Sequence, residues 1–263
     1  MNTMKELRTR SFKPLCGIIF CVTVIVVAFA TSCSNSGGTT KDEFQKEALA
    51  QIGLYETYSW NEVADAFINL SKEAAKQNTN PDALTLERLL NQRSESPVWS
   101  NPNYSNDKPV IGWALVEDTA AVNSIIAQYG AEHLPQDLKL AWSFKPFEIR
   151  HSTIEQPESY ELIALKTSDG KPSLTGESIA SVQKDLTPDN QYCMLFKFDD
   201  EGTKQFAQLT ARNVNRYIAN VIKGKVYSYP MVMCEISNGN AQIAGNFTEE
   251  DIDSIISFIY GKK

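Results

Sequence analysis

The stretch LFKFDDEGTKQFAQLTARNVNRYIANVIKGKVYSYPMVMCEISNGNAQIAGNF, residues 195–247, decides the fold that this sequence predicts. Apolar alternation at its start predicts a strand, and a helix opened by a capping carboxylate follows. Residues 218–222 and 225–232 then predict a hairpin around a Lys-Gly pair, ahead of a short strand bounded by glycines. Because Pro230 cannot donate to a sheet ladder, the second hairpin strand should lie at an edge or break there.

Capping residues mark where the helices of this unit begin. Asp199 or Asp200 caps the helix after the first strand, and apolar residues at helical spacing give that helix a buried stripe. After the last strand, Thr248 and Asp251 form the start signal of a final helix, which Gly261 closes. The unit therefore belongs to the α+β class.

Upstream of this unit, the pattern predicts a second α+β layer. Residues 110–116 form a strand, Asp118 caps a helix closed by Gly130, and residues 138–144 and 160–167 form two further strands. The β-α-β-β order is the beginning of a split, ferredoxin-like layer.

The region before this layer has a helical pattern, which spans residues 41–92. Ser59 and Glu62 have the spacing of a capping box, and Pro81 opens another helix. Ser, Asn and Pro dominate residues 93–109, which makes this loop the best candidate for a domain boundary.

The N-terminus has the pattern of a secretory signal. A basic front precedes the apolar run 17–30, which is too short for a comfortable membrane-spanning helix, and small residues precede Cys33. An uncleaved anchor is the alternative. The cysteine resembles that of a bacterial lipobox, although Phe29 replaces the usual leucine. This likeness implies a signal peptide over residues 1–32, lipidation (palmitate) at Cys33, and a flexible tether over residues 33–40.

The charge of the chain excludes some classes of partner. The formal net charge is −7, and removal of the signal leaves about −10. An acidic protein lacks the basic face that nucleic acid binding requires, and it has no electrostatic attraction to anionic lipid. A lipid anchor would therefore be the means of holding the chain at a membrane.

Two cysteines lie outside the N-terminal region, Cys193 and Cys234. An exported protein could pair them. Strand alternation places them on opposite faces, however, so we expect two free thiols.

Two parts of the chain resemble the first periplasmic domain of SecD, the membrane-embedded helper of Sec protein export. The likeness to the head of that domain lies in DGKP, LTGES, FDDEGTKQFAQLT, VIKGKVYSYP and NGNAQIAGNFTEED. EDTAAVNSIIAQYG and LPQDLKLAWSFK resemble the supporting base in fused SecDF proteins. The resemblance implies a base-like part at residues 108–168 and a head-like part at 169–263, and it leaves 41–107 unassigned.

Three departures from the family pattern matter. Asn215 stands where the family usually has glycine, and asparagine is the non-glycine residue that best tolerates a left-handed turn. Lys223 stands where aspartate is common. In SecD, membrane helices with proton-coupling carboxylates follow the final helix, whereas this sequence ends at Lys263. The resemblance therefore implies a stand-alone lipoprotein without the proton-driven motor.

Little in the sequence indicates catalysis. His133 and His151 have no metal-ligand spacing around them, and Ser228 lies beside neither a GxSxG turn nor a histidine. We therefore expect no enzyme activity, no metal and no cofactor, although a hydrolase would become plausible if a histidine lay beside a nucleophile in a pocket.

A binding surface is the better candidate for a site. One parity of the second hairpin strand carries Tyr227, Tyr229, Met231 and Met233. This face either packs inside the protein or forms an adaptable apolar surface for extended polypeptide, bound by strand addition. The resemblance to SecD, whose head is thought to contact translocating chains, fits the second alternative.

The sequence thus predicts a non-enzymatic envelope lipoprotein that faces the periplasm. Its expected partners are polypeptide or components of the Sec translocon, and its expected role is to assist Sec-dependent export. The alternative is a SecD-derived scaffold that works in an unrelated envelope complex.

Overall fold

The computed structural model describes residues 43–78, 84–90, 107–146 and 158–261. These residues belong to one compact unit, Lys41–Lys263. The predicted signal peptide, Cys33 and the tether lie outside the described residues. Within the described part of the chain, no helix has both the length and the apolar character needed to cross a membrane.

The ferredoxin-like layer forms as predicted. Strand β2 (Val110–Leu115), helix α4 (Thr119–His133), β3 (Leu138–Trp142) and β4 (Ser159–Lys166) follow one another along the chain. The three strands form an antiparallel sheet in the order β2-β4-β3, with β4 inserted between the two strands that α4 connects. One detail is wrong: Gly130 lies inside α4, since the helix continues to His133.

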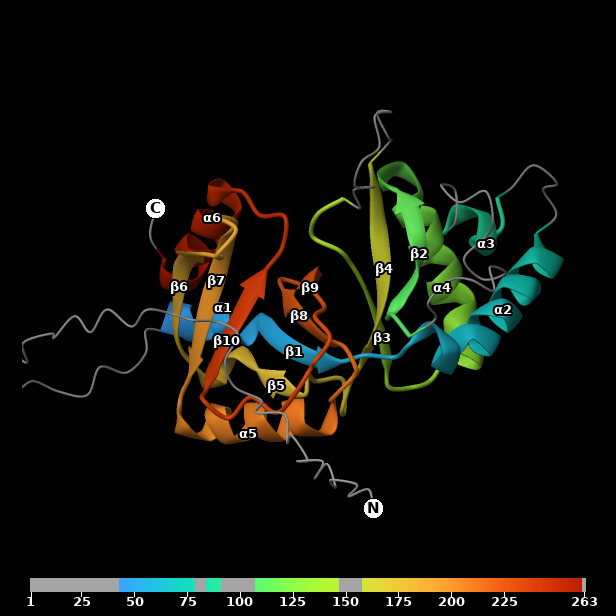
Figure 1. The fold of residues 1–263 in the computed structure, drawn as a ribbon. Coiled ribbons are helices and arrows are strands. Elements are labelled where there is room, and N and C mark those ends of the chain that lie inside the picture. The colour runs from blue at the N-terminus through green and yellow to red at the C-terminus, as the bar shows by residue number, and fades with distance from the viewer. Residues whose placement is uncertain (1–42, 79–83, 91–106, 147–157, 262–263) are drawn as a thin grey trace, which may run out of the picture. The chain divides into compact units, whose positions relative to one another are not determined.

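Helices α2 (Trp60–Gln77) and α3 (Leu86–Leu89) pack with α4 around the core of this layer (Figure 1). The predicted capping box is present, because the backbone N–H of Ser59 donates to Glu62 Oε2 at 2.8 Å. The core is built from large apolar side chains, with Trp60, Phe67, Leu86, Ile111, Val122 and Leu162 among its buried members.

A strand interrupts the region with the helical pattern. After α1 (Glu43–Ala50) comes β1 (Ile52–Glu56), so the prediction of helix throughout residues 41–92 is wrong at this point. Strand β1 is an inner strand of a sheet ordered β5-β1-β8-β9, where Ile52 faces Ile222 of β8. Its residues are buried on both faces, which removes the polar alternation that identifies a strand in the sequence.

The other strands of this sheet are β5 (Leu174–Thr175), β8 (Ile218–Ile222) and β9 (Lys225–Ser228). The turn between β8 and β9 has positive φ at both central residues, 51° at Lys223 and 74° at Gly224, as a two-residue hairpin requires. Asn215 has a φ of 64° and thus takes the left-handed conformation predicted for it. Strand β9 is an edge strand that ends before Pro230, in agreement with the prediction.

A third sheet, ordered β10-β7-β6, combines β6 (Ile179–Leu186), β7 (Tyr192–Phe198) and β10 (Asn240–Ala244). Helix α6 (Glu249–Tyr260) packs on β6 and β7 (Figure 1). Helix α5 (Asp200–Arg212) begins at Asp199, whose carboxylate accepts the N–H of Gly202 at 2.7 Å. The core around α5 and α6 includes Leu49, Ile52, Leu54, Phe196, Phe206, Leu209, Ile252 and Ile259. Residues 49–54 of the N-terminal region therefore complete the core of the predicted head.

The two cysteines have different states. Cys193 is a free, buried thiol, as expected. Cys234 is disulfide-bonded, so the prediction of a free thiol is wrong there. Strand alternation bears only on a bond between Cys193 and Cys234, which are not bonded to each other. It does not exclude a bond between Cys234 and another cysteine.

Candidate functional site

The four predicted site residues do not share one strand face, because β9 ends at Ser228. Tyr227 is half-buried, and its ring stacks on Phe144 with centroids 4.1 Å apart and an interplanar angle of 12°. Its ring centroid is 5.9 Å from that of Phe247. Burial, with a smaller contribution from Asp251, raises the pKa of Tyr227 to about 12. Tyr227 is thus an internal contact of the fold.

Tyr229 is also engaged within the protein. Its hydroxyl donates a hydrogen bond to Glu161 Oε2 at 2.8 Å, across to strand β4. Burial raises the pKa of Glu161, and hydrogen bonds from Tyr229 and Trp113 oppose this effect. Of the two alternatives predicted for this face, packing inside the protein is therefore the one that applies to both tyrosines.

The two methionines lie at the surface, with 40% of Met231 and 73% of Met233 exposed. Two isolated bridges pair this segment with the chain before β8, joining Val214 to Val232 and Tyr217 to Met231. Val214 is 39% exposed and Tyr217 is half-buried. We use the name methionine patch for the exposed residues Met231 and Met233 together with Val214 and Tyr217, which lie on the segment whose backbone pairs with theirs.

Strand addition beside β9 is hindered at its centre. The backbone N–H of Phe144 donates to the carbonyl of Val226 at 2.8 Å, and a parallel bridge joins Ser143 to Val226. An edge position that already has a backbone partner cannot pair with an added strand. The methionine patch offers side-chain contacts instead.

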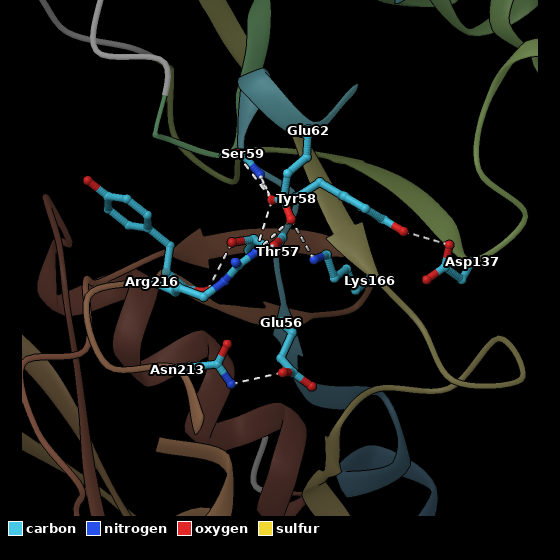
Figure 2. Close-up of polar contacts among 10 residues, drawn as sticks. Glu56, Thr57, Tyr58, Ser59, Glu62, Asp137, Lys166, Asn213 and Arg216 are labelled. Carbon is cyan, nitrogen blue, oxygen red and sulfur yellow. Dashed lines mark hydrogen bonds and ion pairs between the residues drawn. The ribbon is translucent and has the colours of Figure 1, made fainter. Parts of the chain in front are cut away.

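A carboxylate of β1 holds the loop that carries one side of the patch. Asn213, which is 2% exposed, donates through Nδ2 to Glu56 Oε1 at 2.9 Å (Figure 2) and to the carbonyl of Leu209 at 2.8 Å. Arg212 binds both oxygens of Glu56, with Nε 3.2 Å from Oε1 and Nη2 2.9 Å from Oε2. Ser173 donates to Glu56 Oε2 at 3.0 Å.

This environment favours the ionised form of Glu56. Burial alone would raise its pKa, but the hydrogen bonds from Arg212 and Asn213 and the charge of Arg212 outweigh burial and lower the pKa to about 2. The carboxylate is therefore charged throughout the physiological pH range.

Glu62, in the first turn of α2, binds the same loop at a second point (Figure 2). Arg216 Nη2 lies 2.9 Å from both carboxylate oxygens, and Lys166 Nζ of β4 lies 3.0 Å from Oε1. Burial opposes ionisation, yet the N–H of Ser59 and the two cations lower the pKa of Glu62 to about 2. Glu62 thereby connects residues from three distant parts of the chain.

The segment between these two acids joins two sheets. The hydroxyl of Thr57 donates to the carbonyl of Tyr217 at 2.9 Å, while Thr57 pairs in an antiparallel bridge with Leu165 of the β2-β4-β3 sheet. Tyr58 donates to Asp137 Oδ1 at 2.7 Å (Figure 2). The patch loop, residues 213–217, is thus fixed on one side by contacts that extend to the β2-β4-β3 sheet.

Sequence reasoning identified the methionines but not the groups that fix the loop beside them. Glu56, Arg212 and Asn213 show no local pattern, because the contact joins residues far apart in the chain. The ferredoxin-like order and the hairpin could be predicted because their signals are local in the sequence. The partners of Glu56 could not be predicted, because no local signal marks them.

Two of the three residues considered for catalysis or metal binding, His133 and Ser228, lie in the described part of the chain. No group of three or more His, Cys, Asp or Glu side chains in this part of the chain could hold a metal ion. His133 ends α4, and Ser228 accepts a hydrogen bond from Asn220 Nδ2 at 2.9 Å within the hairpin. His151 lies outside the described residues.

The described residues therefore form an α+β protein of antiparallel sheets with exposed methionines on a segment that pairs with a fixed loop. Residues 151–259 match the family model described as "SecDF, P1 head subdomain". This part of the chain is therefore similar to a SecD-type periplasmic head subdomain, which confirms the resemblance found in the sequence.

Curated relatives agree with the match. The chain is 26% identical over 230 residues to the protein translocase subunit SecD of Rhodothermus marinus, covering 84% of this chain and 36% of that protein. It is 38% identical over 85 residues to SecD of Acidaminococcus fermentans, covering 32% and 20%. The chain thus spans about a third or less of the length of these relatives.

Solved structures of SecDF are also similar to the chain. One, described as "Structure and function of a membrane component SecDF that enhances protein export", shares 16% identity and a TM-score of 0.35 and covers 80% of this chain and 92% of that chain. A SecDF crystal structure from Thermus thermophilus shares 18% identity and a TM-score of 0.30, covering 80% and 28%.

Proposed function

We propose that this protein is a non-enzymatic polypeptide-binding module of the cell envelope that assists Sec-dependent export. The observation that supports this proposal is the methionine patch, an exposed apolar surface on a SecD-type head. Methionine side chains are flexible and polarizable, so they adapt to many apolar partners. A translocating polypeptide presents varied apolar side chains, and such a surface suits it. The base at residues 108–168 supports the head at 169–263 in this proposal.

The rigidity of the patch loop also favours binding at this surface. A loop that is already fixed loses little conformational entropy when a ligand binds, which lowers the cost of association. Hydrogen bonds from Asn213 to Glu56 and from Arg216 to Glu62 provide this fixation. The patch therefore combines a backbone that is already fixed with the intrinsically flexible side chains of methionine.

Replacing both Met231 and Met233 with serine should weaken the binding of an unfolded polypeptide about tenfold or more, because the apolar area available for contact is lost. Fluorescence anisotropy with a labelled, reduced and carboxymethylated protein as the unfolded probe measures this. Val116→Ser is the matched control, since Val116 is an exposed apolar residue, 54% accessible, at the end of β2. Equal binding by the double variant and the control would contradict the patch as the site.

The same proposal places the protein at a membrane, held by lipid on Cys33 and facing the periplasm. Cys33→Ala should move most of the protein from the membrane fraction to the soluble fraction of lysed cells, because the apolar run before Cys33 is too short for a comfortable span. Immunoblotting of both fractions measures this. Retention of the variant in the membrane fraction would favour an uncleaved anchor instead.

A further inference from the structure

Strand β6 is an edge strand of the described β10-β7-β6 sheet, and a side chain occupies its outer backbone groups. The N–H of Val182 donates to the hydroxyl of Tyr260 at 2.8 Å, and the same hydroxyl donates to the carbonyl of Val182 at 3.2 Å. One residue of an antiparallel strand presents its N–H and C=O to the same neighbour. The Tyr260 hydroxyl therefore takes the place of a strand at this position.

A second side chain occupies an outer backbone N–H farther along the edge. The N–H of Leu186, which shares the parity of Val182, donates to the carboxylate of Asp185 at 2.8 Å. Leu186 itself is 48% exposed. At this edge, the side chains of Tyr260 and Asp185 occupy backbone groups that an added strand could bind instead, and Leu186 offers an apolar contact beside them.

The charged residue that usually guards such an edge is engaged elsewhere. Edge lysines oppose the approach of another strand. Lys184, however, is bound to α6, with Nζ 2.8 Å from Glu249 Oε1 and 2.7 Å from Asp253 Oδ1. Its ammonium is neutralised by two carboxylates and is held against the helix.

The position of Tyr260 makes its hydroxyl removable. It is the last residue of α6, directly before Gly261, whose φ of 64° ends the helix. Helix ends open at low cost, and a neutral hydroxyl that leaves the strand regains its hydrogen bonds from water. A backbone strand would offer Val182 the same donor and acceptor with better alignment.

We infer that β6 is a docking edge for an extended segment of unfolded polypeptide, which adds to the sheet as a fourth strand and displaces the hydroxyl of Tyr260. This inference rests on the proposed function, because it names a second way in which the same class of ligand is held. The methionine patch contacts side chains, whereas β6 contacts the backbone and therefore accepts many sequences.

The test uses the full chain, the unfolded probe described above, and amide hydrogen exchange. Binding should slow exchange in β6. Tyr260→Phe keeps the ring and removes the hydroxyl, so it should strengthen binding roughly 2- to 10-fold, the equilibrium effect of releasing one neutral hydrogen bond. A proline-free peptide should lose most of its affinity for the wild-type chain when alternate residues are N-methylated, because one edge then lacks donors.

The outcomes separate the inference from the proposed function. Probe binding that depends on Met231 and Met233, with unchanged exchange in β6 and equal affinity of the N-methylated peptide, overturns the inference and leaves the proposed function standing. Protection of β6 together with a gain in Tyr260→Phe supports the inference, even if the methionine variant binds normally. No binding of the probe by the wild-type chain overturns both. The N-methylated peptide keeps the test decisive if Tyr260→Phe does not fold.

Discussion

Replacing Gly176 with alanine should lower the free energy of unfolding by about 3 kcal/mol, because the added Cβ has no room. Gly176 lies in the short helical turn Gly176–Ser178, which contacts both α1 and β1. An ideal Cβ would lie 2.7 Å from the Cβ of Ile52 and within van der Waals overlap of the carbonyl oxygen of Leu49. The carbonyl oxygen of Leu49 belongs to the backbone, which cannot move away by a change of rotamer as a side chain can. Urea unfolding followed by circular dichroism measures the change.

Gly224→Ala is the matched control for this experiment. Gly224 has a positive φ of 74° but nothing within 4 Å of an added Cβ, so alanine there should cost about 1 kcal/mol of backbone strain. A similar small loss for Gly176→Ala would show that the N-terminal segment does not lie against this turn. The comparison thus tests the contact that sequence reasoning missed.

Replacing Glu56 with glutamine should lower the free energy of unfolding by about 2 kcal/mol at pH 7, since Arg212 and Asn213 lose a charged acceptor. The folded pKa of Glu56 is about 2, against an ordinary value of 4.5. A lowered pKa means that the ionised carboxylate stabilises the fold. This contribution is complete above pH 4.5 and disappears as the pH falls towards 2. The difference between wild type and Glu56→Gln should therefore shrink over this range.

Denaturant unfolding at pH 7, 5 and 3 measures this difference. Glu73→Gln is the control, because Glu73 makes a surface contact with Lys76 at 3.3 Å and such pairs contribute little. It should leave stability unchanged at each pH. An equal loss for Glu56→Gln at pH 7 and pH 3 would indicate that shape, and not charge, makes Glu56 important.

The sequence predicted the elements whose signals are local. Each capping box, at Ser59 and at Thr248, depends on two residues three positions apart, and the hairpin turn at Lys223 depends on two adjacent residues. These predictions are confirmed. Strand β1 was missed because its five residues lie between helices and are buried on both faces, so that its state depends on a partner strand far along the chain.

The candidate site could be predicted in part for the same reason. Alternation gave Met231 and Met233 a common parity, and both are exposed. It gave Tyr227 and Tyr229 the same parity. In the structure, however, Tyr227 stacks on Phe144 and Tyr229 donates a hydrogen bond to Glu161, so both tyrosines contact distant segments of the chain. Strand parity predicts which side chains lie on the same face of a strand. It does not predict which distant residues pack against that face.

The pairing of β1 with β8 has a consequence for how this protein is made. Ile52 is synthesised early, but Ile222, which faces it, emerges much later. At typical rates of chain elongation this interval is on the order of ten seconds or more. For most of this interval, until residues 174–175 of β5 are made, the buried strand β1 has no partner strand, and its pairing with β8 comes later still. Long-range pairing of this kind is slow once the partner is present. The nascent protein is therefore itself an unfolded client that must be kept from aggregating until its last third has been made.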